Sequence, residues 1–169
     1  MKITIIGSGY VDLTTGVCLS HLGHQVVCVD NDVEKIKLLK QGISPIYEPG
    51  LEELLKEGME KGTLSFTDSI EEGTKHGFAI FICVGTPPRE DGSADLSSIE
   101  FVATRIDETM DEYKLIIEKS TVPVQTGLKL KTTILYPDRI VIGVENERAE
   151  KLMREIYEKI DAPFIVTNI

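Results

Sequence analysis

The stretch IIGSGYVDLTTG, residues 5–16, decides the fold class of this chain. It ends a short apolar run and opens a helical pattern, so Gly7 and Gly9 lie in a turn between a predicted strand and a predicted helix. Gly7 permits the tight turn, and Gly9 lets the backbone approach a diphosphate that the free N–H groups of the first helical turn would face. This arrangement predicts a dinucleotide-binding domain.

An acidic residue follows at the position that such a domain requires. Asp30 directly follows the second predicted strand and lies 21 residues beyond Gly9. A carboxylate there accepts both ribose hydroxyls and repels a 2′-phosphate, so NAD is favoured over NADP. Alternatively, Asp30 caps the helix that begins near Asp32, and the two roles are compatible.

Asp12 departs from the dinucleotide-binding pattern, which has a third glycine at this position to let the helix pack close to the strand. Gly16 lies four residues later on the same helical face and offers a second place for close approach. The positive end of a helix tolerates an acid, but a carboxylate beside a diphosphate repels it. We expect Asp12 to weaken NAD binding about ten- to hundredfold, and Asp12→Gly to tighten it.

Short runs rich in Ile and Val alternate with helical patterns along the whole chain. The predicted strands are residues 2–6, 25–29, 78–84, 115–119, 139–144 and 164–169, and the predicted helices are 11–22, 33–40, 51–61, 98–110, 126–134 and 148–160. This alternation predicts an α/β protein of the Rossmann type, a doubly wound and mostly parallel sheet with helices on both faces. The whole chain, 1–169, is expected to be one such domain.

Composition narrows the partners and the compartment. The net charge of −10 argues against nucleic acid or an anionic membrane as a partner, because both require a basic face. We expect a cytoplasmic protein, since the chain opens on a strand pattern without a secretory h-region, and its longest apolar run is too short to span a bilayer. Cys18, Cys28 and Cys83 lie in apolar runs without CxxC spacing, which favours buried thiols over disulfides or a metal site.

Five blocks of sequence extend beyond a general nucleotide-binding pattern: GSGYV, VDNDVEKI, PIYEPGLEELL, VGTPPREDGSADLS and KSTVPVQTG. On these blocks the chain resembles the N-terminal NAD-binding domain of UDP-glucose 6-dehydrogenases, within the wider group of nucleotide-sugar dehydrogenases. The resemblance implies an oxidoreductase of nucleotide-sugar metabolism that uses NAD to oxidise UDP-glucose twice, to UDP-glucuronate, through a thioester on a cysteine.

The resemblance also assigns roles to individual residues. It implies that Asp30 and Lys35 bind the adenosine ribose, that Thr86 and Thr121 lie near the nicotinamide, and that Thr121 places the water of the hydrolytic stage. The residues that it places in the pyrophosphate turn are Gly7, Gly9, Tyr10 and Val11. Alternatively, Lys35 is a solvated surface lysine, both threonines only end strands, and Glu48 is a loop acid.

Some features of the family pattern are absent from this sequence. A family strand and its substrate-gripping loop are missing between residues 134 and 137, as are the downstream domains with the catalytic cysteine. We therefore expect this chain to be the NAD-binding domain of such an enzyme and to be inactive by itself. A nucleotide sugar is expected as a partner only in a complete enzyme, and a homo-oligomer is an open alternative to a monomer. Two alternatives stay open: a non-catalytic Rossmann module with weakened NAD binding that serves as a structural or regulatory partner, and a dehydrogenase for another small alcohol.

Overall fold

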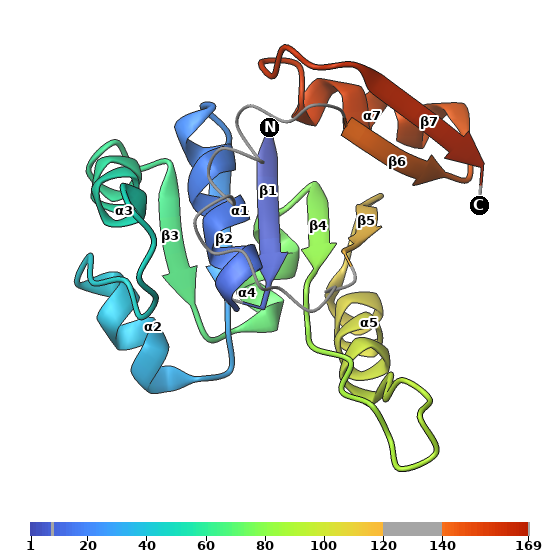
Figure 1. Ribbon diagram of the computed structural model, residues 1–169, viewed down its shortest axis with the longest axis horizontal. Helices are drawn as coiled ribbons and strands as arrows, with labels where there is room; N and C mark the ends of the chain where they lie inside the picture. The colour runs from blue at the N-terminus through green and yellow to red at the C-terminus, as the bar shows by residue number, and fades with distance from the viewer. Residues whose placement is uncertain (8, 120–139, 169) are drawn as a thin grey trace.

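The computed structural model describes residues 1–7, 9–119 and 140–168 (Figure 1). The elements, in chain order, are β1 Lys2–Ile6, α1 Tyr10–His21, β2 Gln25–Val29, α2 Val33–Lys40, α3 Leu51–Glu60, β3 Leu64–Thr67, α4 Ile70–His76, β4 Ala79–Ile82, α5 Ser97–Thr109, β5 Leu115–Glu118, β6 Ile140–Val144, α7 Glu147–Ile156 and β7 Phe164–Asn168. No helix in these ranges is long and apolar enough to cross a membrane.

Five strands form a parallel sheet in the order β3-β2-β1-β4-β5. The chain starts in the middle of the sheet, winds to one edge through β2 and β3, and then crosses β1 to continue through β4 and β5. Every residue of β4 is buried, as expected for a central parallel strand that is covered on both faces. This order confirms the predicted Rossmann-type fold class.

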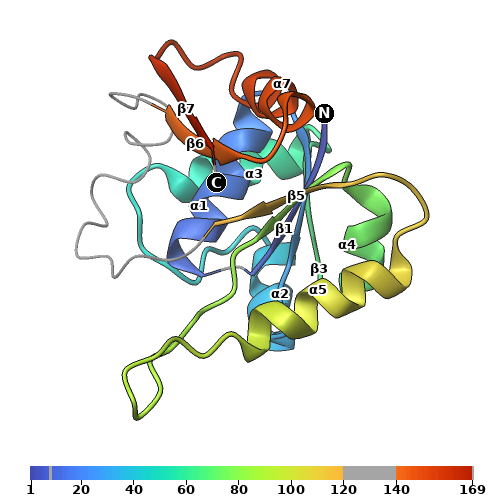
Figure 2. The same cartoon turned by 90° about the vertical axis from the view of Figure 1, so that its right-hand side faces the viewer.

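Helices cover both faces of this sheet, as Figure 2 shows with the sheet nearly edge-on. On one face, α1 and α3 pack with apolar side chains of β1 and β2 such as Ile3, Ile5 and Cys28. On the other face, α5 packs with Ile6, Ile80 and other apolar side chains of the sheet, while α4 receives a hydrogen bond of 2.7 Å from the Thr4 hydroxyl to the Gly73 carbonyl.

The remaining strands, β6 and β7, pair in parallel with each other and form a separate two-stranded sheet. Their connecting helix α7 shares the core of the larger sheet through Met153 and Ile156. His24, just before β2, anchors α7, because its Nε2 donates to the Ile156 carbonyl at 2.8 Å. The sequence predicted both β6 and β7 as strands. It did not predict that, in the described part of the chain, they would form a sheet separate from the other strands.

Two elements were not predicted, β3 and α4. β3 has only four residues with one exposed, so its apolar pattern is too short to stand out. A sequence signal for α4 was available, because Ser69 and Glu72 have the spacing of a capping box. The Ser69 hydroxyl does accept from the Glu72 N–H at 3.2 Å. The predicted helix 126–134 lies outside the described residues.

Candidate functional site

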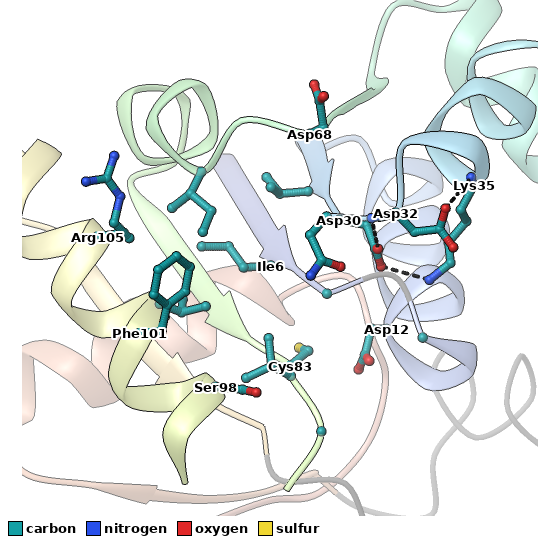
Figure 3. Close-up of a pocket in the computed structure, with 18 of the residues that line it drawn as sticks. Ile6, Asp12, Asp30, Asp32, Lys35, Asp68, Cys83, Ser98, Phe101 and Arg105 are labelled. Carbon is teal, nitrogen blue, oxygen red and sulfur yellow. Dashed lines mark hydrogen bonds and ion pairs between the residues drawn. The ribbon is translucent and has the colours of Figure 1, made fainter.

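A cavity with a volume of about 1310 Å³ lies at the carboxyl ends of β1, β2 and β4. β1 has β2 on one side and β4 on the other, so this is the place where the winding direction of the sheet reverses. Ligands of open α/β sheets bind at this crevice. Figure 3 shows side chains from β1, α1, α2 and α5 arranged around it.

The glycine turn forms the floor of the cavity. Gly7 has a φ of +106°, and a Cβ atom there would lie 2.7 Å from the Cys83 carbonyl oxygen. No other residue type fits this conformation and space. Gly9 precedes α1 without a side-chain cap, so the first turn of the helix directs its N–H groups outward beside Tyr10 and Val11, which also line the cavity. This cradle fits a diphosphate.

Asp12 lies in the first turn of α1 and is only 2% exposed. One carboxyl oxygen, Oδ2, is 3.0 Å from the point that a Cβ on Gly9 would occupy, and the other, Oδ1, has no hydrogen-bond partner among the described residues. Burial raises the pKa of this carboxyl to about 6, although the charge of Lys119 and a hydrogen bond with the Cys83 thiol oppose the rise. The carboxyl therefore lies in the wall of the cavity, beside the glycine turn (Figure 3).

Gly16 is the position where α1 comes close to the sheet. A Cβ there would lie 2.6 Å from the Cys28 sulfur and 3.4 Å from the Ile5 side chain. The helix thus packs tightly one turn after Asp12, which confirms the expectation that Gly16 permits the close approach. Asp12 therefore does not prevent the helix from packing closely on the strands.

Asp30 follows β2, and its carboxylate accepts hydrogen bonds from the start of the adjoining helix and from a lysine. Its Oδ1 accepts from the Asp32 N–H at 2.9 Å, and its Oδ2 accepts from the Lys35 ammonium at 2.9 Å. The side-chain cap of α2 is Asp32, which accepts from the Lys35 N–H at 3.0 Å. Asp30 thus does not cap the helix itself, and Lys35 is not merely solvated. The pair faces the cavity (Figure 3), where it offers an acceptor and a donor to sugar hydroxyls.

The YEPG loop is tied to the glycine turn through Tyr10. The Tyr10 hydroxyl lies 2.6 Å from Glu48 Oε2 and donates to it, and it lies 3.1 Å from the Tyr47 carbonyl. Glu48 is only 7% exposed, so it is more than a solvated loop acid. This contact raises the pKa of the Tyr10 phenol, since a nearby carboxylate opposes its ionisation.

Thr86 lies after β4 and lines the cavity together with the other predicted cofactor-binding residues, with the exception of Thr121. Thr121 lies outside the described residues. The sequence interpretation did not identify the wall that α5 and the segment after β3 provide. Its members include Asp68, Ile70, Ser98, Phe101 and Arg105. Phe101 and Arg105 are four residues apart and therefore lie on the same face of α5. Phe101 is 61% exposed, and only the structure shows that such a large apolar side chain is exposed at this place.

Comparison with known proteins supplies the family. Residues 1–136 match the model of the NAD-binding domain of the UDP-glucose/GDP-mannose dehydrogenase family. Among curated relatives, the UDP-glucose 6-dehydrogenase YwqF of Bacillus subtilis is 38% identical over 197 aligned positions, which cover 100% of this chain and 45% of the relative. The UDP-glucose 6-dehydrogenase of Rickettsia felis is 39% identical, with 100% and 44% covered. The chain thus spans about half the length of these relatives.

Solved structures agree with the sequence relatives. A ternary complex of GDP-mannose dehydrogenase from Pseudomonas aeruginosa superposes with a TM-score of 0.93 at 32% identity, covering 100% of this chain and 47% of that one. A UDP-glucose dehydrogenase from Pyrobaculum islandicum has a TM-score of 0.86 at 32% identity, covering 99% and 46%. These structures share the fold and a recognisable part of the sequence with this chain.

Proposed function

This chain belongs to the UDP-glucose/GDP-mannose dehydrogenase family as its NAD-binding domain, and from that premise we propose that its cavity binds NAD for the oxidation of UDP-glucose. The observation that carries the proposal is that the glycine turn and the Asp30–Lys35 pair line one cavity at the reversal point of the sheet. When bound, NAD supplies the hydride acceptor. The chain's own residues would hold and orient it.

Each end of the cavity has chemistry that suits one part of the dinucleotide. The diphosphate cradle would consist of Gly7, Gly9, Tyr10 and Val11. A side chain at Gly7 would collide with the backbone after β4, so only glycine leaves room at the start of this turn. Asp30 would accept from the ribose hydroxyls, and Lys35, which already donates to Asp30, would donate to them. Thr86 would lie at the nicotinamide half, with Thr121 as the second threonine and as the residue that places a water.

UDP-glucose is the substrate that the curated relatives favour, since both relatives described above are named UDP-glucose 6-dehydrogenases. We propose that the complete enzyme carries out the oxidation, and that this chain alone does not. None of its three cysteines is available as the thiolate that a thioester requires, because Cys18, Cys28 and Cys83 are all buried. Burial also raises the pKa of Cys28 to about 12 and that of Cys83 beyond its usual range.

The proposed absence of a family strand and loop between residues 134 and 137 has two supports. The alignment with the relative from Bacillus subtilis has 197 positions, although this chain has 169 residues, so the relative carries positions that this chain lacks. In the described residues, β5 and β6 belong to different sheets. Two statements remain predictions: that the protein is located in the cytoplasm, and that it assembles into homo-oligomers.

Calorimetric titration of the chain with NAD and NADP tests the proposal. We expect NAD to bind more tightly than NADP, because Asp30 would face the 2′-phosphate. Absence of NAD binding under any condition would favour the second function, a structural or regulatory Rossmann module, for which the buried Asp12 beside the glycine turn is the specific observation. Steady formation of NADH from UDP-glucose and NAD by this chain would contradict the proposed inactivity.

A further inference from the structure

Asp12 lines the cavity, but the proposed function gives it no role. Its side chain lines the cavity beside Gly9, yet it is almost fully buried. Its Oδ1 has no hydrogen-bond partner among the described residues. A charged carboxylate in such a place has no donor for Oδ1, whereas a protonated carboxyl needs fewer donors.

Among the described residues, the charged and titratable groups around Asp12 do not neutralise it. Cys83 after β4 donates a hydrogen bond, and the charge of Asp30 after β2 opposes the ionisation of Asp12. Cys28 of β2 is a neutral thiol, because burial raises its own pKa to about 12. Two lysines attract it, but both are engaged elsewhere. Lys35 of α2 donates to Asp30 at 2.9 Å, and Lys119 after β5 donates to the Thr15 hydroxyl at 3.2 Å. In the described part of the chain, neither lysine forms an ion pair with Asp12.

A diphosphate bound over Gly9 would bring further negative charge to this wall. Its charge favours the neutral form of a neighbouring acid, and so does the exclusion of water from the cavity. We propose that Asp12 is protonated whenever the dinucleotide is bound, so that NAD binding takes up one proton from solvent onto the Asp12 carboxyl. This inference rests on the proposed function and converts the repulsion at this position into pH-dependent binding.

The pH dependence follows from linkage. The free carboxyl has a pKa raised to about 6, and the bound one would be higher still. Below about pH 6 the free protein already carries the protonated acid, so the Kd of NAD is constant. Above it, each pH unit raises the Kd of NAD up to about tenfold, so the Kd at pH 8 exceeds that at pH 5 by about a hundredfold.

The experiment is calorimetric titration of the whole chain with NAD between pH 5 and 8, with the wild type beside Asp12→Asn. We expect a steep profile for the wild type and a flat one for Asp12→Asn, because an amide mimics the neutral acid. At pH 7, titrations in buffers of different ionisation enthalpy should give an uptake of about one proton for the wild type and none for the variant. The matched control is Asp68→Asn, which removes an exposed carboxylate from the same cavity and should keep the slope.

Each remaining outcome is informative. NAD binding that is equally tight at every pH in the wild type would overturn this inference and leave the proposed function intact. A flat profile that tightens only when Mg²⁺ is added would overturn it as well, in favour of a cation that bridges Asp12 and the diphosphate. If neither the wild type nor Asp12→Asn binds NAD at any pH, the proposed function itself is wrong and this inference with it.

Discussion

Replacing Asp12 by Asn should stabilise the fold, and by an amount that depends on pH. The Asp12 carboxyl is buried, and its pKa rises from 3.8 to about 6 mainly because burial disfavours the charged form. The native state therefore binds this proton more tightly than the unfolded chain does. The resulting stability is present at low pH and is lost as the pH rises through about 6. An asparagine has the shape of the neutral acid and never ionises, so it avoids this loss.

The magnitude follows from the shift of about two pKa units. One unit corresponds to about 1.4 kcal/mol, so Asp12→Asn should raise the free energy of unfolding by up to about 3 kcal/mol at pH 8. Linkage reduces the gain to about 1.6 kcal/mol at pH 5, to about 0.6 kcal/mol at pH 4 and to almost nothing at pH 3 and below. The stabilisation should thus vanish in the range where both states carry the protonated acid.

Urea unfolding of the two proteins at pH 4, 5, 6 and 8, without nucleotide, measures this difference. Asp68→Asn serves as the control, because Asp68 is exposed and its removal should leave the free energy of unfolding almost unchanged at each pH. A gain that does not vary with pH would refute the reasoning. So would a destabilised Asp12→Asn at pH 8, since it would mean that the ionised carboxylate is held by favourable contacts.

Three other changes test the fold and the site. His24 is buried and its pKa is lowered, so the free energy of unfolding of the wild type should fall as the pH drops below the unfolded value of 6.5. In thermal or urea unfolding, His24→Gln should be about 1–3 kcal/mol less stable than the wild type at pH 8, but its stability should fall less on acidification. Gly16→Ala should destabilise by about 1–3 kcal/mol, because its Cβ would lie 2.6 Å from the Cys28 sulfur, whereas Gly85→Ala meets open space and should be neutral in the same unfolding assay. Asp30→Asn should narrow the preference for NAD over NADP in calorimetry, and an unchanged ratio would count against a ribose-binding role.

Much of the candidate site could be predicted because it is encoded locally. Gly7 and Asp30 occur at the ends of strands whose apolar runs are continuous, and parallel strands bring such ends to one edge of a sheet. The wall from α5 could not be predicted in this way. Phe101 and Arg105 face the cavity only because α5 packs on the opposite face of the sheet from α1 (Figure 2), and a single sequence does not state which face a helix covers.

The sequence by itself determined the Rossmann-type fold, the glycine turn and the family, because strand runs, turn glycines and a terminal acid act over short distances along the chain. Only the tertiary structure decided what Asp12 is. In the sequence it is an acid in the place of a glycine. In the fold it is a buried carboxyl between Gly9 and Cys83, with a raised pKa and an unsatisfied oxygen among the described residues. Its ionisation depends on the burial and charges that β4, β2 and the end of β5 bring to it from distant parts of the chain.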